Sequence, residues 1–471
     1  MSAWAVLLLY FFTISNVLCY GPDLSGLRGL LSQDASVAYD RLGAPRWSEF
    51  PAPDAGAVVN AATEDDVLVT VRYCIEQNIP FLAQNGGHGS SITFTLDKSG
   101  VIINLEQLNH VRVNAAGTEL WLEAGALVSD VVAAAFARNT TVPTPTCNCI
   151  GQLGAGLGAG YGNLVGAYGL IIDNLLSVNI VTPAGDRLEV SRESDSELWF
   201  AIRGAGPNFG IVTSATMRAY PVNKSGLSAW LATLTFSEKK IEDLVQAMNT
   251  LILHPEMAIN LIFAASESGN NISFSIMANL FYYGTDSAGR EAFSTIYAAG
   301  PETDDAGVLS YDHWNDPQDG GCAKGQRKQR YGAGLARMVP ATWRELFQEY
   351  KTFVRQTGAV KSAVIMNGNP IRESTDVVDS AYPFRSTIKF NTWVQPSIVD
   401  SSLDAVAREW GLKSRDLLRS TSGLTKNCTY INGAYGDEDL SVVYGDNVQR
   451  LRKLKAQMDP HGRFNEWFPL S

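Results

Sequence analysis

The sequence has little positive charge and, after its first residues, no long apolar run. Its 471 residues carry 37 Lys and Arg against 48 Asp and Glu, a net charge of −11, which argues against nucleic acid or an anionic membrane as a partner. No stretch beyond the N-terminus is apolar enough to span a bilayer. Internal repeats, low-complexity tracts and long linkers are absent too, so the length and the hydrophobic content of 45% indicate a globular protein of two or three domains.

Histidine is also scarce, with five residues in the chain. His88 lies in a glycine-rich turn, whereas His110 follows a predicted strand and His461 lies in a terminal turn. We expect His110 and His461 at the surface, which leaves few histidines for acid–base chemistry. The sequence predicts no metal site.

The N-terminus carries a short apolar run, AVLLLYFFTI, over residues 5–14. It is too short to cross a bilayer, and Val17-Leu18-Cys19 fits the end of a signal peptide, although no Lys or Arg precedes the run. We therefore predict a signal peptide over residues 1–19 and a secreted protein; the alternative is a buried or interfacial helix. Sequons of the form N-x-S/T are consistent with export and predict N-glycosylation at Asn139, Asn223, Asn271 and Asn427.

An odd number of cysteines remains after removal of the signal peptide. The chain has six, and loss of the one at position 19 leaves Cys74, Cys147, Cys149, Cys322 and Cys428. In a secreted protein, an odd number leaves at least one cysteine outside intramolecular disulfides. Cys74 falls in a helical pattern and is expected to be a small buried hydrophobe. The pairing of the others stays open.

Glycine is concentrated between residues 147 and 174, CNCIGQLGAGLGAGYGNLVGAYGLIIDN, with eight glycines within residues 151–170. Glycine loses the most conformational entropy on folding, so such a run indicates backbone that approaches another group closely. A phosphate-bearing cofactor is the expected group. Gly154, Gly156 and Ala159 fit a dinucleotide fingerprint, but the strand before it and the helix after it are missing. A structural glycine-rich loop is the other alternative.

The N-terminal half alternates strands and helices. Thr63 and Asp66 form a capping box ahead of apolar residues at helical spacing, and Ser129 is expected to cap a helix that runs through Ala137. We predict strands at 79–83, 101–105, 120–124, 175–182, 187–190 and 211–219, and an apolar element at 197–202. Glycine turns at 84–91 and 203–210, together with the stretch described above, favour a ligand held by backbone from several sides.

The character of the sequence changes near Asn223. A helix is expected over 241–252, and the strands 273–282 and 388–395 show one apolar face and one face of mixed aromatic and polar residues. These strands predict an antiparallel sheet in a second domain. The mixed face is interpreted either as the lining of a pocket or as a face that helices or water cover. A short helix over 448–458 closes the chain.

Several motifs together resemble one family. The turn Gln84-Asn-Gly-Gly-His-Gly-Ser-Ser91 is similar to the R-x-G-G-H-S turn of FAD-linked oxidases with a vanillyl-alcohol-oxidase-type (PCMH-type) flavin domain. Residues 147–162 resemble the C-P-x-V-G-x-G-G-H-x-x-G-G-G-Y-G segment of the berberine-bridge-enzyme-like branch, in its fungal form. The resemblance extends over about residues 40–220 and 425–468 through Asp173-Asn174, Glu197-Leu-Trp199, Arg203-Gly-Ala-Gly206, Asn208-Phe-Gly-Ile-Val212 and Tyr444-Gly-Asp446, and in the middle of the chain through Tyr382-Pro-Phe-Arg385.

The resemblance implies an α+β fold in which a split, two-subdomain FAD-binding domain accompanies a substrate domain with an antiparallel sheet covered by helices. The implied ranges are 40–222 for the FAD-binding domain, 223–424 for the substrate-binding domain and 425–471 for a C-terminal segment that returns to the FAD domain. It also implies FAD bound covalently through His88, with Cys147 as the candidate for a second bond. The implied cofactor-binding residues are Gln84, Asn85, Gly86, Gly87, His88, Gly89, Ser90, Cys147, Gly151, Gly154, Gly158, Gly160, Tyr161, Gly162, Gly206, Gly210, Ile211 and Asn432.

Four departures from the family pattern concern the site. Gln84 stands where the family has Arg, and Ala155 replaces a histidine. Asn148 replaces a proline, and Cys149 beside it adds a competing thiol. Gly433 stands where the family's Y-x-N-Y pattern has a tyrosine that assists proton removal.

The catalytic candidates implied are therefore Tyr435, Asn432 and Arg385. Tyr435 is expected to accept the proton, for which its ordinary pKa of about 10 must fall. Arg385, with Lys389, is a candidate for the cation that lowers this pKa or clamps the substrate; a plain surface charge is the alternative. Asn432 is expected to contact the flavin or the substrate, and Asp437 and Glu438 are further candidates for the base.

Together these observations predict a secreted, monomeric FAD-dependent oxidase of a small organic substrate, a specialised metabolite, with O2 as electron acceptor. Two alternatives stay open. One is a carbohydrate or oligosaccharide oxidase, and the other is a flavin-carrying binding protein with little turnover.

Overall fold

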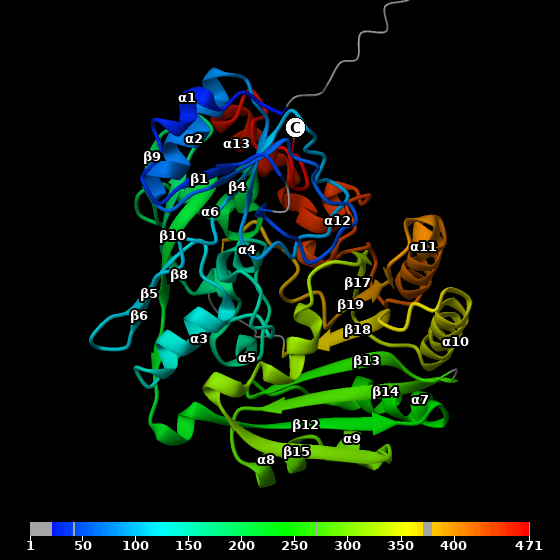
Figure 1. Cartoon of the computed structure of the whole chain (residues 1–471). Coiled ribbons are helices and arrows are strands. Elements are labelled where there is room, and N and C mark those ends of the chain that lie inside the picture. The colour runs from blue at the N-terminus through cyan, green and yellow to red at the C-terminus, as the bar shows by residue number, and fades with distance from the viewer. Residues whose placement is uncertain (1–20, 41–42, 270, 371–378, 471) are drawn as a thin grey trace, which may run out of the picture.

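The computed structural model describes residues 21–40, 43–269, 271–370 and 379–470, which fold into two halves with separate cores (Figure 1). The first core joins residues near the N-terminus, such as Leu27 and Ile103, to Leu451 and Phe468 near the C-terminus. The second core is built mainly from the middle of the chain. The α+β fold class is confirmed, and the domain boundaries stay a prediction. The predicted signal peptide lies outside the described residues.

Two sheets form the first half. In the first, the pairs β2–β4 and β3–β4 are parallel and β1 is antiparallel to β2; the order is β1 (Ser36–Ala38), β2 (Ala57–Asn60), β4 (Val101–Asn104), β3 (Phe81–Gln84). The second is antiparallel, in the order β5 (Val111–Val113), β6 (Glu119–Glu123), β10 (Ile211–Arg218), β8 (Leu175–Val181), β9 (Arg187–Val190). A short pair joins β7 (Thr140–Thr141) to β11 (Tyr220–Pro221).

The crossover between the parallel strands β2 and β3 is the helix α2 (Glu64–Glu76). Its predicted capping box is confirmed: Thr63 Oγ1 accepts a hydrogen bond from Asp66 N, and the Asp66 carboxylate accepts one from Thr63 N. Cys74 is fully buried on the core side, as expected. The remaining helices of this half are α1 (Ser25–Arg28), α3 (Val128–Phe136), α4 (Gln152–Gly156), α5 (Val165–Tyr168), α6 (Ser196–Ala205), α12 (Leu440–Tyr444) and α13 (Val448–Met458).

The start of α3 differs from the prediction. Its N-cap is Leu127, and Ser129 lies inside the first turn, so the predicted Ser129 cap is wrong. The reason is Asp130, whose carboxylate accepts the Leu127 N–H at 2.8 Å. An acidic side chain in the first turn satisfies a free backbone donor there and also favours the helix dipole.

One large antiparallel sheet forms the second half. Its strand order is β15 (Thr303–Ser310), β12 (Ser228–Phe236), β14 (Asn271–Tyr282), β13 (Met257–Ser268), β18 (Ala363–Gly368), β19 (Phe390–Gln395), β17 (Tyr331–Leu335). A short pair joins β16 (Arg327–Lys328) to β20 (Ser397–Ile398). The helices packed on this sheet, seen at its right, behind it and at its lower edge in Figure 1, are α7 (Ile241–Thr250), α8 (Asp286–Ala292), α9 (Ser294–Ala298), α10 (Pro340–Thr357) and α11 (Asp404–Ser420).

The two faces of this sheet have different partners. On β13, Ile259, Leu261 and Phe263 are fully buried in the core under the helices, whereas Asn260 and the residues alternating with them keep some accessible surface. The C-terminal segment lies against β17: a Cβ added to Gly332 would stand 2.5 Å from the carbonyl oxygen of Gly433. The mixed face of the sheet is therefore turned toward the segment that returns to the first half.

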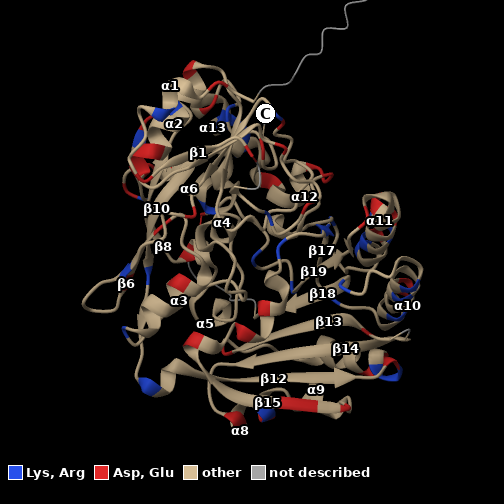
Figure 2. Cartoon of the chain, in the orientation of Figure 1, with Lys and Arg blue, Asp and Glu red and all other residues tan. Residues whose placement is uncertain are grey.

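The surface carries charges of both signs over elements of both halves (Figure 2). The four sequon asparagines are all exposed, as are His110 and His461. Within the described ranges, no helix combines the length and the hydrophobicity needed to cross a membrane.

Candidate active site

Three segments far apart in the sequence meet at the glycine-rich stretch: 84–91, 151–162 and 430–436. A Cβ added to Gly151 would stand 2.5 Å from Asn85 Nδ2, and one added to Gly158 would stand 2.2 Å from Asn432 Oδ1. Contacts this close mean that a side chain at either position would displace the asparagine beside it. The predicted site residues Asn85 and Asn432 thus both contact the glycine-rich stretch, although they lie far apart in the sequence.

Most of the other predicted cofactor glycines pack against protein as well. A Cβ on Gly162 would meet Thr144 O at 1.8 Å, one on Gly206 would meet Leu157 at 3.3 Å, and one on Gly210 would meet Val181 O at 2.5 Å. Gly86, Gly87, Gly89 and Ser90 lie in the turn after β3, Gly160 has a φ of +79°, and Ile211 begins β10. Backbone compactness explains these glycines before any ligand is considered.

The turn around Gln84 is held by an arginine from another segment. Arg46 Nη1 donates to Gln84 Oε1 at 2.7 Å, and Arg46 Nη2 donates to Gly89 O at 2.6 Å. Gln84 Nε2 in turn donates to Ala44 O at 2.9 Å. Both polar atoms of Gln84 are thus used in holding the turn, and its contact with a cofactor stays a prediction.

His88 lies where these segments meet. Its Nδ1 is 3.2 Å from Gly86 O, its Nε2 is 3.5 Å from Cys149 Sγ, and its ring stacks on Trp47 at 5.6 Å between centroids. Burial, reinforced by the positive charge of Arg330, lowers the pKa of His88 to about 3. The imidazole is therefore neutral at physiological pH and offers the unprotonated nitrogen that a nucleophile needs.

The cysteines near His88 differ in whether they form a disulfide. Cys149 forms a disulfide with Cys322, with 5.8 Å between the Cα atoms, while Cys147 keeps a free thiol. The disulfide removes the competing thiol that Cys149 would have supplied. Burial raises the pKa of Cys147 to about 11, so this thiol is protonated near neutrality.

Tyr161 belongs to a tyrosine cluster in the first core that joins the glycine-rich stretch to Tyr382 and Tyr430. Its hydroxyl is 3.0 Å from that of Tyr382, and its ring meets that of Tyr430 edge to face at 4.9 Å. The Tyr430 hydroxyl oxygen accepts from Gly160 N at 3.3 Å and from Asn432 Nδ2 at 2.8 Å. Burial raises the pKa of Tyr430 to about 12, so its hydroxyl keeps its proton at neutral pH.

The three catalytic candidates are not assembled as the sequence predicts. Asn432 lies in the site, where its Nδ2 donates to Ala155 O at 2.8 Å. Tyr435 is 1% exposed in the second core, with its ring stacked on Tyr331 at 4.2 Å. Arg385 Nη1 contacts both carboxylate oxygens of Asp173, at 2.7 and 2.8 Å. No contact between described residues joins Arg385 to Tyr435, and Lys389 Nζ instead donates to Asn249 O.

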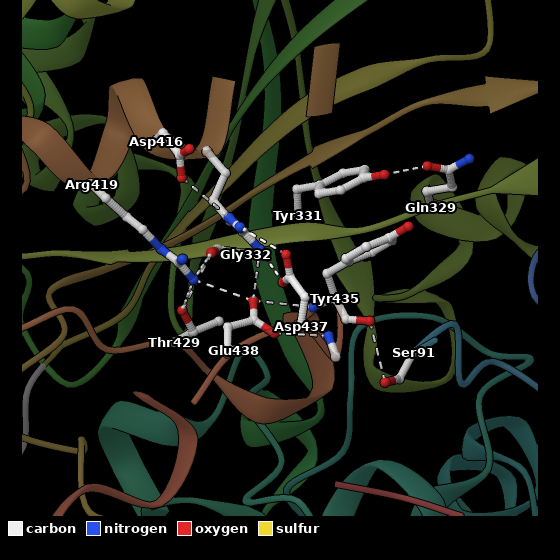
Figure 3. A network of polar contacts seen from close by, with 12 residues as sticks. Ser91, Gln329, Tyr331, Gly332, Asp416, Arg419, Thr429, Tyr435, Asp437 and Glu438 are labelled. Atoms are coloured by element: carbon white, nitrogen blue, oxygen red, sulfur yellow. Dashed lines mark hydrogen bonds and ion pairs between the residues drawn. The ribbon is translucent and has the colours of Figure 1, made fainter. Parts of the chain in front are cut away.

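The two carboxylates after Tyr435 form ion pairs with arginines of α11 (Figure 3). Glu438, whose side chain is fully buried, accepts from Arg415 Nη1 at 3.3 Å, from Arg419 Nη2 at 3.2 Å and from Gly436 N at 2.8 Å. Asp437 pairs with Arg415. These contacts fix the C-terminal segment to the second half and make both carboxylates poor candidates for a catalytic base.

Arg330, just before β17, is a site residue that sequence reasoning missed. The centre of its guanidinium lies 4.6 Å from the ring centroid of Trp47 and 5.7 Å from that of Trp393. Its Nη1 is 3.5 Å from Asn432 O, and its Nε is buried without a partner. The sequence signal is the basic run at 327–330 in an acidic chain. Such a run by itself is typical of a solvated surface.

A row of asparagines crosses the mixed face of the large sheet. Asn279, Asn260, Asn367 and Asn391 stand directly opposite one another on β14, β13, β18 and β19. At one end, Thr233 Oγ1 donates to Asn279 Oδ1 at 3.2 Å; at the other, Asn391 Oδ1 is buried without a partner. A parallel apolar row, two residues along each strand, consists of Met277, Ile262, Ile365 and Trp393.

Comparison with known proteins bears on this arrangement. Residues 55–191 match the family model for an FAD binding domain. FAD-linked oxidoreductase OXR1 of Pyricularia oryzae is 31% identical over 435 residues, covering 89% of this chain and 84% of that protein. The chain belongs to the FAD-linked oxidoreductase family.

Solved structures share the fold of this oxidoreductase. BBE-like 1 of Physcomitrella patens superposes with a TM-score of 0.81 at 19% identity, covering 94% of this chain and 99% of that one. The xylooligosaccharide oxidase of Myceliophthora thermophila C1, solved in complex with xylobiose, gives a TM-score of 0.79 at 17% identity, with coverages of 95% and 98%. The predicted family and enzyme class are confirmed.

The residues of this FAD-linked oxidoreductase fit FAD. Gly154 differs from the packed glycines, because a Cβ there meets no atom within 4 Å and the residue is exposed. Asn85 Nδ2 donates to Ala124 O at 2.8 Å, while its Oδ1 is buried without a partner. An open glycine leaves room for a ligand, and the unsatisfied amide oxygen suits a cofactor that carries hydrogen-bond donors, as FAD does in its ring and its hydroxyl groups.

Proposed function

We propose that this FAD-linked oxidoreductase is a secreted oxidase that holds FAD covalently through His88 and oxidises a small organic substrate, a specialised metabolite, with O2 as acceptor. The observation that carries the proposal is the meeting of His88, the glycine-rich stretch and Asn432 at one place. The neutral imidazole of His88 supports the covalent bond. The exposure of Asn139, Asn223, Asn271 and Asn427 supports glycosylation and hence secretion.

The proposed division of labour follows from the positions of the residues. When bound, FAD supplies the acceptor for the substrate's hydride and passes the electron pair to O2, which leaves as H2O2. The turn at 84–91 and the stretch at 151–162 hold the cofactor, and the mixed face of the sheet holds the substrate. Tyr430, which keeps its proton at neutral pH, donates a hydrogen bond to a substrate oxygen.

Anaerobic mixing of the purified protein with phenolic metabolites and with oligosaccharides tests the proposal. Flavin that a substrate bleaches, and that air restores with release of H2O2, supports an oxidase. Flavin that is bound but inert toward both classes supports the flavin-carrying binding protein instead.

Replacing Tyr430 by phenylalanine is expected to slow flavin reduction by about 10²-fold or more, because one hydrogen-bond donor to developing charge has that effect. Tyr435, the proton acceptor proposed from the sequence, provides the matched variant: because its ring is stacked in the second core, Tyr435→Phe is expected to leave the rate close to that of the wild type. Stopped-flow reduction across pH compares the two. A large loss in Tyr435→Phe alone would restore Tyr435 as the base.

A carbohydrate or oligosaccharide oxidase is the second candidate, and the asparagine row favours it. Neighbouring strands lie about 4.8 Å apart, so four strands extend the row over roughly 14 Å. Amides both donate and accept hydrogen bonds, which suits a ligand with hydroxyl groups along one edge. The neighbouring apolar row ends at Trp393 and suits the ligand's less polar face.

The double variant Asn260→Leu with Asn367→Leu is expected to weaken binding of xylobiose about thirtyfold, since each lost hydrogen bond costs roughly 1 kcal/mol. Asn109→Leu, at an exposed position of the first half, is the control. Titration calorimetry measures the dissociation constants. Unchanged xylobiose affinity in the double variant would remove the support for a carbohydrate substrate.

A further inference from the structure

Arg330 carries a positive charge that no described carboxylate neutralises. The acidic groups near it are those of Cys147 and Tyr430, which are both uncharged near neutral pH, and burial lowers the pKa of Arg330. Its hydrogen bonding amounts to a 3.5 Å contact from Nη1 to the carbonyl oxygen of Asn432, a length at which a hydrogen bond is weak. Nε is buried and has no acceptor. A guanidinium has five N–H donors, so most of the hydrogen-bonding capacity of Arg330 is unused.

The neighbouring cations make stronger hydrogen bonds than Arg330, although Arg46 Nε is likewise buried without a partner. Lys328 Nζ, 4.4 Å from the Trp47 centroid, donates to Trp47 O at 2.9 Å and to Ala323 O. Arg46 is used by Gln84 and Gly89. Lys328 adds positive charge to the surroundings of Arg330, whereas Arg46 has the carboxylate of Glu49 near it.

The energetic balance at Arg330 favours an anion. The residue keeps some accessible surface, but even partial removal of a charge from water is costly, whereas the face of an aromatic ring returns about 2 kcal/mol at best. The rings of Trp47 and Trp393 therefore orient the guanidinium without compensating its charge. A delocalised anion would supply both the charge and the planar acceptors that arginine prefers.

The position of Arg330 connects it to the proposed chemistry. Trp47, which Arg330 contacts, also stacks on His88. Asn432, whose carbonyl oxygen Arg330 approaches, touches the glycine-rich stretch. On the side of the sheet, Trp393 lies 3.7 Å from the position of a Cβ on Gly433. An anion bound to Arg330 would thus lie among the residues proposed for the flavin and the substrate.

We propose that Arg330 is the counter-ion of a delocalised organic anion bound in this site, and that the substrate is accordingly an acid: a phenol, an enol or a carboxylic acid. The inference rests on the proposed function and specifies its substrate class. The same chemistry has a second source in this protein, the anion of two-electron-reduced FAD.

A phenol or an enol also removes the need for a protein base. Its O–H proton passes to the solvent when it ionises, before or during binding. The conjugated C–H bond then breaks with its electron pair, which would leave as hydride to FAD, while the oxyanion forms a C=O bond; the substrate so loses two electrons and becomes a quinone methide or an enone. This agrees with a site in which Tyr430 keeps its proton and Asp437 and Glu438 are paired with arginines.

The test compares Arg330→Gln and Arg330→Lys with the wild-type holoenzyme. Arg327→Gln is the control, because the Arg327 guanidinium comes from the same segment and is already paired with Asp404, with 2.7 Å between Nε and Oδ1. Two quantities are measured without turnover. One is the midpoint potential of the flavin in the absence of substrate; the other is the dissociation constant of benzoate, with neutral benzamide beside it, from the change in the flavin spectrum.

If the anion is the substrate, Arg330→Gln raises the dissociation constant of benzoate at least tenfold. It leaves the dissociation constant of benzamide and the midpoint potential of the flavin unchanged. If the anion is the reduced flavin, the potential falls by about 30 mV, the equivalent of a tenfold change for two electrons. Arg330→Lys keeps the charge and retains part of either effect, and it carries the test if Arg330→Gln does not load FAD. Unchanged benzoate affinity and unchanged potential in both variants overturn the inference. A wild-type protein without FAD instead overturns the proposed function.

Discussion

Replacing His88 by alanine is expected to leave no flavin attached to the denatured polypeptide. In the wild type, we expect acid precipitation to carry the flavin into the protein pellet; in His88→Ala it should pass entirely into the supernatant. The reason is that His88 presents a neutral imidazole, with its pKa lowered to about 3, beside the turn and the glycine-rich stretch proposed to hold FAD. Flavin absorbance of pellet and supernatant measures the result.

Cys147→Ser is the matched variant, because it removes the other candidate for a bond. Its pellet should keep the flavin, since the Cys147 thiol is protonated near neutrality and the histidyl bond does not depend on it. Peptide mass mapping of the wild type then decides between one bond and two: a flavin peptide that contains His88 but never Cys147 establishes a single bond. Wild-type protein that releases all its flavin in acid would falsify the covalent attachment altogether.

Glu438→Gln is expected to lower the free energy of unfolding by about 3–5 kcal/mol, the usual cost of removing one partner from a buried ion pair. The fully buried carboxylate accepts from Arg415, Arg419 and two backbone N–H groups, and glutamine would present an amide N–H₂ to a guanidinium. FAD content should fall as well, because the same contacts hold the segment that carries Tyr430 and Asn432. Denaturant unfolding and the ratio of flavin to protein absorbance measure the two effects.

Lys413→Gln controls for the loss of an ion pair on the same helix. Lys413 is more than half exposed and pairs with Glu349 at 2.9 Å, and an exposed pair contributes less than about 1 kcal/mol. If both variants unfold at the same denaturant concentration, the network in Figure 3 does not hold the two halves together as argued.

Where local chemistry determines the structure, the sequence predicted it well. The capping box at Thr63 and Asp66 and the alternation of β14 and β19 depend on residues a few positions apart, and all three are confirmed. The glycine-rich stretch could be recognised for the same reason, since close approach of backbone leaves a compositional trace. Ser129 shows the limit of this reasoning, because Asp130 satisfied the N–H that a serine cap was expected to serve.

Features that depend on partners far away in the sequence could not be predicted. Tyr435 lies two residues from a family position, but its ring packs on Tyr331, more than a hundred residues away, and the sequence does not encode that stacking locally. Arg330 is one of several cations in a basic run and becomes exceptional only through Trp47 and Trp393. The asparagine row likewise requires the register of β14, β13, β18 and β19, which is set by long-range pairing.

The disulfide between Cys149 and Cys322, which are 173 residues apart, has a practical consequence for anyone who prepares this protein. In an oxidising secretory pathway the nucleophiles at the proposed flavin site are His88 and Cys147. In a reducing cytosol the disulfide does not form, and Cys149 and Cys322 keep free thiols, the first with its sulfur 3.5 Å from His88 Nε2. If FAD is held covalently as proposed, the expression host selects which flavin adducts the chain can make, so batches from two hosts should be compared by mass before their activities are.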